Sequence, residues 1–266
     1  MQLAVAARTD TGMIRSGNED SYFAEANRER GLFVVADGMG GHAAGEVASE
    51  MAVQIVAREL SLIAHASTTE ISDKLAQALK RANVAIYERT IAEVDKQGMG
   101  TTASVLMLSD GKYLIGQVGD SRVYLLRDGA LRQLTKDHSY VQEQVDAGFL
   151  TPEQARYHPY SNVITRCVGA SAEVEPDTYE GEVKKGDVFL VASDGLTGMV
   201  DDRRLLQLLM ARASPQRIVD ALISEANGRG GLDNITAVLV QVLSVKDEEE
   251  SATTPGATSS GANPAD

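Results

Sequence analysis

The sequence feature that most constrains the fold is a short apolar run that ends in an acidic residue and several glycines. Residues 32–36 read Leu-Phe-Val-Val-Ala, which is typical of a strand covered on both faces. The run ends at Asp37, whose charge is costly beside a core unless it is paired. Gly38, Gly40 and Gly41 follow, so the backbone there can bend tightly and approach something small. A carboxylate beside bare backbone carbonyls suits a hard cation such as magnesium or manganese.

Asp-Gly is also a common hairpin turn, and the chain contains two examples for comparison. Asp110-Gly111 and Asp128-Gly129 lie between pairs of strand-like runs with polar neighbours, so we predict hairpin turns at both. Asp37-Gly38 instead ends an apolar run and is followed by more glycine and a helix-like segment. This context favours a functional site at Asp37.

Acidic residues also border apolar runs at three other places in the chain. They are Asp120 after residues 113–118, Asp194 after residues 189–193, and Asp233 before residues 235–242. Upstream, one polar segment carries Arg15, Glu19 and Asp20. One acid at a strand end is ordinary, whereas several with an arginine nearby predict a converging cluster of oxygen ligands.

These acidic segments belong to a set of motifs that occur in a fixed order. The set is Arg15…Glu19-Asp20, Asp37-Gly38-Met39-Gly40-Gly41-His42, Gly100-Thr101-Thr102, Gly119-Asp120-Ser121-Arg122, Ser193-Asp194-Gly195 and Asp233-Asn234. Taken jointly, they resemble the type 2C family of metal-dependent protein serine/threonine phosphatases (the PPM family) in its compact bacterial form. The resemblance runs from about Leu3 to Val245, and no single motif would carry it alone.

The resemblance implies a two-metal centre occupied by Mn²⁺ or Mg²⁺, in which a hydroxide held between the ions attacks phosphorus in line. The implied direct ligands are Asp37, which bridges both ions, the carbonyl of Gly38, Asp194 and Asp233, while Glu19 and Asp20 act through metal-bound waters. Asp120 resembles the ligand of a third, weaker ion that it shares with Asp194. The alternative for Asp120 is a loop cap onto the backbone of Ser121 or Arg122.

Two further residues take catalytic roles by the same resemblance. Arg15 lies four residues before Glu19, where the family places a phosphate-binding arginine, and its planar fork suits bidentate binding of a phosphate. The alternative is a surface salt bridge between Arg15 and Glu19. His42 is the candidate general acid that protonates the leaving oxygen. The other histidines, at positions 65, 138 and 158, are expected to be structural.

Other phosphoryl-transfer chemistries lack the residues that they need. A cysteine phosphatase requires an arginine six residues after its nucleophile, but Glu173 follows Cys167 at that distance. Four scattered histidines do not supply the several metal-binding histidines of calcineurin-type enzymes, and an all-oxygen cluster disfavours zinc. The sequence contains no Gly-x-x-x-x-Gly-Lys-Ser/Thr loop, which argues against a nucleotide-driven kinase or ATPase.

Composition limits the partners and the location. The formal net charge of −13 disfavours nucleic-acid binding, because a phosphate backbone needs a basic face. A single cysteine fits a reducing cytoplasm, and neither a signal peptide nor a membrane span is expected. Residues 1–245 are predicted to form one phosphatase domain. Residues 246–266 are rich in Ser, Thr, Gly, Ala, Pro and acids, and are predicted to be a disordered tail.

The apolar periodicity predicts helices at about 47–64, 70–94, 205–211 and 215–227, with strands before, between and after them. Residues 101–134 read as an antiparallel meander, and residues 148–160 resemble the family's variable flap beside the active site or an ordinary surface excursion. Helices layered on antiparallel sheet indicate an α+β fold. The resemblance sharpens this expectation to a four-layer α-β-β-α sandwich with the acids at one edge.

The resulting functional hypothesis is metal-dependent hydrolysis of phosphoserine and phosphothreonine in proteins. Expected partners are phosphorylated proteins, including the serine/threonine kinases that the enzyme opposes, and the chain is expected to act as a monomer. Two alternatives stay open: a phosphatase dedicated to one regulatory protein, and a phosphoprotein-binding module without turnover. Degenerate relatives of the second kind should lack one of the metal-binding aspartates, and here all are present.

Overall fold

The computed structural model describes residues 1–40, 44–61, 63 and 68–245, and its strands form two antiparallel sheets. The first sheet contains, in spatial order, β1 (Gln2–Asp10), β11 (Ile235–Ser244), β10 (Val188–Ala192), β7 (Arg122–Arg127) and β8 (Ala130–Gln133). The second contains β2 (Asp20–Ala26), β3 (Arg30–Met39), β5 (Ala103–Ser109), β6 (Lys112–Val118) and β9 (Asp177–Glu182), with β4 (Gly100–Thr101) paired to β3. The predicted tail lies outside the described residues.

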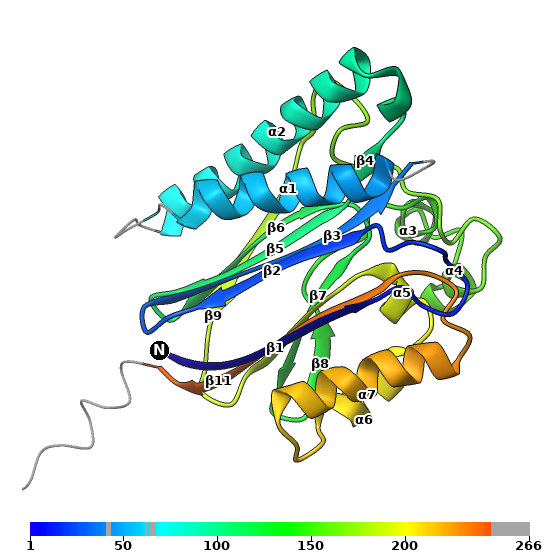
Figure 1. Cartoon of the computed structure of the whole chain (residues 1–266). Coiled ribbons are helices and arrows are strands. Elements are labelled where there is room, and N and C mark those ends of the chain that lie inside the picture. Colours follow the sequence, from blue (N-terminus) through cyan, green and yellow to red (C-terminus); the bar gives the residue numbers. More distant parts are fainter. Residues whose placement is uncertain (41–43, 62, 64–67, 246–266) are drawn as a thin grey trace, which may run out of the picture.

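Helices cover the outer face of each sheet, as Figure 1 shows. Helices α1 (Ala44–Ser61) and α2 (Thr68–Ala92) lie on the β2–β9 sheet, and α6 (Asp202–Leu209) and α7 (Pro215–Gly228) lie on the β1–β8 sheet. Three apolar clusters fill the three interfaces, the middle one between the two sheets. The expected α-β-β-α sandwich is therefore confirmed.

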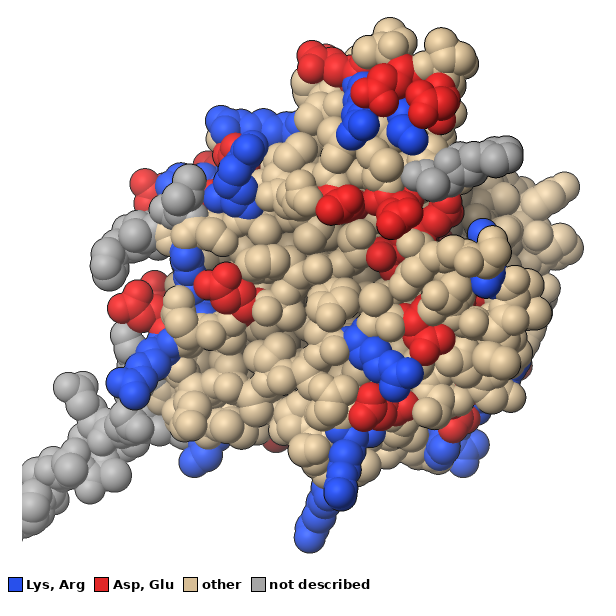
Figure 2. All heavy atoms as spheres, in the orientation of Figure 1, with Lys and Arg blue, Asp and Glu red and all other residues tan. Residues whose placement is uncertain are grey.

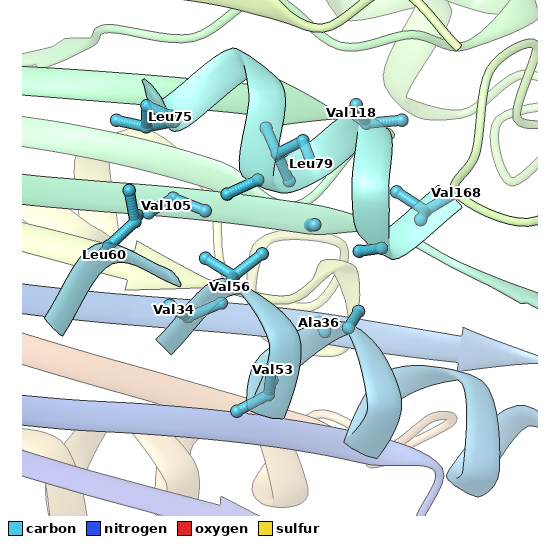
Figure 3. Packing of buried hydrophobic residues seen from close by; sticks show 14 of the residues in the cluster. Val34, Ala36, Val53, Val56, Leu60, Leu75, Leu79, Val105, Val118 and Val168 are labelled. Carbon is cyan, nitrogen blue, oxygen red and sulfur yellow. The ribbon is translucent and has the colours of Figure 1, made fainter. Parts of the chain in front are cut away.

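The packing of α1 and α2 shows that some apolar residues at helical spacing do not face the sheet. In α1, small residues such as Ala48 and Ala52 face the sheet, and Val47, Met51 and Ile55 sit only at the margin of that core. In α2, Leu75 and Leu79 pack inward as expected (Figure 3), whereas Val84 and Ile91 are 45% and 64% exposed. Small side chains bring a helix close to a sheet, so a stripe of large apolar residues does not locate the contact face.

The predicted single meander over residues 101–134 is wrong. Strand β5 pairs with β6 in one sheet, and β7 pairs with β8 in the other. The chain crosses between the sheets at Gly119, Asp120 and Ser121, which places Asp120 where the two sheets meet. Both predicted hairpin turns are confirmed, since Asp110 and Asp128 adopt positive φ values of 47° and 52° between paired strands.

Residues 134–176 connect β8 to β9 and carry the helices α3 (Tyr140–Asp146) and α4 (Pro152–Arg156). Thr151 caps α4 in a complete capping box, as its sequence predicts. Residues 164–168 form no strand: Ile164 and Val168 each form only an isolated bridge. The four-residue helix α5 (Asp194–Thr197) is too short to leave a periodic signal in the sequence. Within the described residues, no helix is both long and apolar enough to span a membrane.

Candidate active site

The acidic residues of the separate motifs meet at one edge of the sandwich. Strand β3 extends through Asp37 to Met39, because Gly38 and Met39 pair with β4, so the expected end of the strand at Asp37 is wrong. The antiparallel register of β2 and β3 places Asp20 directly opposite Asp37. Figure 2 shows acidic side chains gathered over this part of the surface, beside the ends of β2 and β3.

The backbone of Asp37 is fixed by the two threonines of the Gly-Thr-Thr motif. Thr102 Oγ accepts a hydrogen bond from the Asp37 amide at 2.9 Å, and Thr101 Oγ donates to the Asp37 carbonyl at 2.9 Å. Thr102 Oγ also lies 2.8 Å from Ser121 Oγ, next to Asp120. These positioning roles were not assigned from the sequence.

Glycine at positions 38 and 195 is required by close packing. A Cβ atom on Gly38 would lie 2.1 Å from the Gly45 carbonyl oxygen, and one on Gly195 would lie 1.9 Å from the Asn234 carbonyl oxygen. The two Asp-Gly motifs are thus places where backbone segments touch, one at the first turn of α1 and the other beside the Asp233-Asn234 segment. The glycines bring the acids close together.

Asp20 is anchored from one side only. Its Oδ2 atom accepts hydrogen bonds from Ser193 Oγ at 2.8 Å and from Thr236 Oγ1 at 2.6 Å. Its Oδ1 atom is buried without a partner, and so are Oδ1 of Asp120 and Oδ1 of Asp194. A buried unpartnered carboxylate oxygen is costly, so three of them in one cluster need a common explanation.

The charges of the cluster act on one another. The pKa of Asp20 is raised to about 7, mainly by burial and then by the charges of Asp194 and Asp233, while hydrogen bonds from Thr236 and Ser193 act in the opposite direction. The pKa of Asp37 is raised well above its usual range by loss of hydration and by the charges of Asp20, Asp194 and Asp120, although the residue as a whole keeps some exposed surface.

The other two acids show the same behaviour. Burial and the charges of Asp194 and Asp137 raise the pKa of Asp120 well above its usual range, against the opposing charge of Arg122. Burial and the charge of Asp233 raise the pKa of Asp194, while a hydrogen bond from the Asp37 carboxyl lowers it. The charged forms of these acids therefore disfavour one another.

The chemistry of these residues fits a hard divalent cation. Among the residues that the structure describes, no three His, Cys, Asp or Glu side chains form a ready-made metal-binding group. Mg²⁺ keeps several waters and usually takes one or two carboxylates, so a complete protein shell is not required. The unpartnered oxygens of Asp20, Asp120 and Asp194 and the mutual repulsion of the cluster are what a cation would relieve.

Asp233 and Asn234 join the cluster to the loop before β2. Arg15 Nη2 donates to Asp233 Oδ2 at 2.7 Å, so its salt-bridge partner is Asp233 and the alternative of a bridge to Glu19 is wrong. Asn234 Oδ1 accepts from the Glu19 amide at 2.8 Å, and Asn234 Nδ2 donates at 2.9 Å to the carbonyls of Thr11 and Gly17. Asn234 thereby holds the segment that carries Arg15 and Glu19.

Burial raises the pKa of Glu19. The charges of Asp233 and Glu46 raise it further, and the charge of Arg15 lowers it.

His42, like His65, lies outside the described residues. His138 is buried behind the cluster: its Nδ1 accepts from the Gly119 amide at 3.1 Å, and its own amide donates to the Gly119 carbonyl. This agrees with the structural role expected for His138.

The acids open into a cleft of about 790 Å³. The cleft is lined at one end by Arg15, Asp120, Asp194 and Asp233, and elsewhere by residues of α3, α4 and the segment 157–162. Figure 1 shows α3 and α4 beside this end of the sandwich. The segment 148–160 therefore borders the acid cluster, as expected of a flap, and is not a remote surface excursion.

Comparisons with known proteins agree with this geometry. Residues 13–227 match the family model described as "Protein phosphatase 2C". A Listeria monocytogenes protein named "Serine/threonine phosphatase stp" is 40% identical over 238 residues, which cover 88% of this chain and 94% of that protein. The Streptococcus agalactiae serine/threonine phosphatase structure has a TM-score of 0.85 at 38% identity, covering 91% of this chain and 100% of that one.

A second solved structure, the catalytic domain of the serine/threonine protein phosphatase PstP in complex with two manganese ions, has a TM-score of 0.81 at 38% identity. The match covers 91% of this chain and 99% of that domain. Sequence, fold and the order of the motifs therefore lead to the same conclusion, which is that the chain belongs to the protein phosphatase 2C family.

Proposed function

We propose that this serine/threonine protein phosphatase hydrolyses phosphoserine and phosphothreonine esters at the edge where Asp20, Asp37, Asp120 and Asp194 converge. The observation that carries the proposal is the set of three buried, unpartnered carboxylate oxygens within this mutually repelling cluster. Such an arrangement is unfavourable without cations and well suited to binding them.

Metal dependence is supported by the relative with two manganese ions, and we propose that either Mn²⁺ or Mg²⁺ serves here. Asp37, Asp194, Asp233 and the Gly38 carbonyl would hold two ions directly, with Glu19 and Asp20 acting through water. When bound, such ions lower the pKa of a water nucleophile and neutralise charge on the phosphoryl oxygens.

The remaining catalytic roles go to a guanidinium and an imidazole. Arg15 is half-exposed at the rim, and its bond to Asp233 leaves further N–H donors for a phosphate. A cation bound to Asp233 would weaken its bond with Arg15 and free more guanidinium N–H donors. His42 remains our candidate for the proton donor to the leaving seryl or threonyl oxygen.

The natural substrates are proposed to be phosphorylated proteins, including the serine/threonine kinases that the enzyme opposes. The single cysteine supports a cytoplasmic location, and the net charge of −13 argues against nucleic acid as a partner. The monomeric state stays a prediction.

We also propose that the catalytic domain ends near Val245. A chain truncated there should fold and hydrolyse phosphopeptides like the full chain, and an inactive product would show that the boundary lies elsewhere.

The test of the function is phosphate release from peptides that differ only in carrying phosphoserine, phosphothreonine or phosphotyrosine, with Mn²⁺, with Mg²⁺ and with a chelator. We expect metal-dependent release from the first two peptides. Binding without release would favour the phosphoprotein-binding module, and activity on only one regulatory protein, with none on peptides, would favour the dedicated phosphatase. Full activity in chelator would contradict the metal centre.

A further inference from the structure

The cleft continues beyond the acid cluster along a lining of mixed character, in which apolar residues lie among neutral polar ones such as Gln142 and Asn162. Eight of its lining residues are apolar: Val141, Val145, Pro152, Ala155, Tyr157, Pro159, Met199 and Leu232. Seven are charged: Arg15, Asp120, Arg122, Asp137, Arg156, Asp194 and Asp233. A phosphoryl group bound at the acid cluster would leave this continuation to the peptide that carries it.

The charged lining residues outside the acid cluster already have partners. Arg122 binds both oxygens of Asp137, with a shortest distance of 2.7 Å, and donates to Tyr124 Oη at 3.1 Å. Arg156 Nη2 donates to the Gly198 carbonyl at 3.1 Å. The Arg122–Asp137 pair is therefore satisfied within the protein, whereas the guanidinium of Arg156 keeps further N–H donors.

Two of the apolar residues expose large side chains and come from different parts of the chain. Tyr157 follows α4 and is 79% exposed, and Leu232 lies between α7 and β11 and is 56% exposed. The Arg156 bond to Gly198 ties the end of α4 to the α5 segment, next to Tyr157. Leu232 directly precedes Asp233, and both residues line the same cleft.

We propose that Tyr157 and Leu232 form an apolar subsite for the residues that flank the phosphorylated serine or threonine, so that the enzyme prefers large apolar neighbours over alanine. The occupant is a segment of the phosphoprotein substrate, because the subsite is continuous with the place where its phosphate reacts. This inference rests on the proposed function. Covering an exposed aromatic or leucine side chain should change kcat/KM by roughly tenfold.

The experiment compares two phosphothreonine peptides, one with leucine and one with alanine on both sides of the phosphoresidue, and p-nitrophenyl phosphate as a substrate without neighbours. The variants are Tyr157→Ser and Leu232→Ser. Matched controls are Phe149→Ser, whose side chain is 76% exposed between α3 and α4 but outside the cleft, and Met210→Ser, which like Leu232 is 56% exposed.

We expect the wild-type protein to favour the leucine peptide by about tenfold in kcat/KM. Each cleft variant should lose most of that preference, with p-nitrophenyl phosphate turnover unchanged, and each control should keep it. Equal kcat/KM for both peptides in the wild type would overturn the proposal, as would equal losses in Phe149→Ser and Tyr157→Ser. If no substrate is hydrolysed with Mn²⁺, the proposed function itself fails, which is a distinguishable result.

Discussion

Asp20 and Asp37 are direct register partners on the antiparallel strands β2 and β3. Like charges in that position repel, and the charge of Asp20 contributes, after burial, to the raised pKa of Asp37. The fold therefore holds an unfavourable pair in place at one edge of the sheet, and a divalent cation would relieve its repulsion.

The first prediction concerns Asp37→Asn. At saturating Mn²⁺, phosphopeptide turnover should fall on the order of a hundredfold or more, because a ligand common to both ions is lost. In chelator, the melting temperature should rise, because one of the repelling charges is removed. The stabilisation by metal, about 2.7 kcal/mol at a hundredfold excess over the dissociation constant for the wild type, should shrink.

The matched control is Asp110→Asn, which alters an Asp-Gly pair in a hairpin turn where asparagine is also tolerated. It should behave like the wild type in turnover and in melting, with and without metal. A near-normal rate in Asp37→Asn, or a wild-type rate that persists in chelator, would contradict the two-metal centre.

The second prediction concerns the pH dependence of the metal-free protein. The pKa of Asp20 rises from 3.8 to about 7 on folding, so between these values the folded state binds more protons than the unfolded state. Asp20 therefore contributes stability that is lost as pH rises from about 4 to about 7, the reverse of a salt-bridged aspartate. Burial lowers the pKa of His138, which makes stability rise with pH near 6 and opposes this trend.

The difference between wild type and Asp20→Asn removes the contribution of His138, which is common to both, and leaves the titration of Asp20 together with its effect on Asp37. We expect the variant to gain unfolding free energy relative to the wild type as pH increases from 4 to 7 in chelator. Saturating Mn²⁺ should remove the effect, because metal binding favours the ionised carboxylates. Parallel pH curves for the two proteins in chelator would show that Asp20 does not titrate in this window.

Several features of the site could be predicted from sequence because they are local. Asp-Gly at the end of an apolar run differs from Asp-Gly between polar residues, and that contrast separated Asp37 from Asp110 and Asp128. The partner of Arg15 and the crossing between sheets at Gly119–Ser121 depend on which strands become neighbours. Which strands become neighbours is decided by residues far apart in the sequence, such as Arg15 and Asp233, and leaves no local pattern.

Asn234 shows a second limit, because its role depends on hydrogen-bond geometry that residue type does not reveal. The third prediction is that Asn234→Ala lowers the unfolding free energy by about 1–3 kcal/mol, since the Glu19 amide and the carbonyls of Thr11 and Gly17 lose their partner. Mn²⁺ affinity should fall as well, because the loop that carries Glu19 is released.

Asn234→Asp is the graded control, since it keeps the acceptor for the Glu19 amide but loses both donor bonds. Its Mn²⁺ affinity should lie between those of the wild type and the alanine variant, as measured by calorimetric titration. Unfolding curves and metal affinity unchanged in Asn234→Ala would show that the loop is held by other contacts.

The last prediction concerns Asp120, for which the metal-ligand and loop-cap interpretations make opposite predictions. Asp120 is 5% exposed, its Oδ1 atom has no partner, and its carboxylate hydrogen bond is to its own amide. If the residue were a loop cap, Asp120→Ala should cost about 1 kcal/mol and change the rate little. Because burial and the charges of its neighbours Asp194 and Asp137 raise its pKa, we expect the reverse in chelator, a gain in unfolding free energy.

The metal role is tested with Asp120→Ala by calorimetric titration and by phosphopeptide turnover at saturating Mn²⁺. If Asp120 holds only a third, weaker ion, which it would share with Asp194, Asp120→Ala should leave two tight metal sites while turnover slows. An unchanged rate would refute a catalytic role for Asp120. Loss of every metal site would instead place Asp120 among the primary ligands, since its carboxylate would then be needed to hold the first two ions.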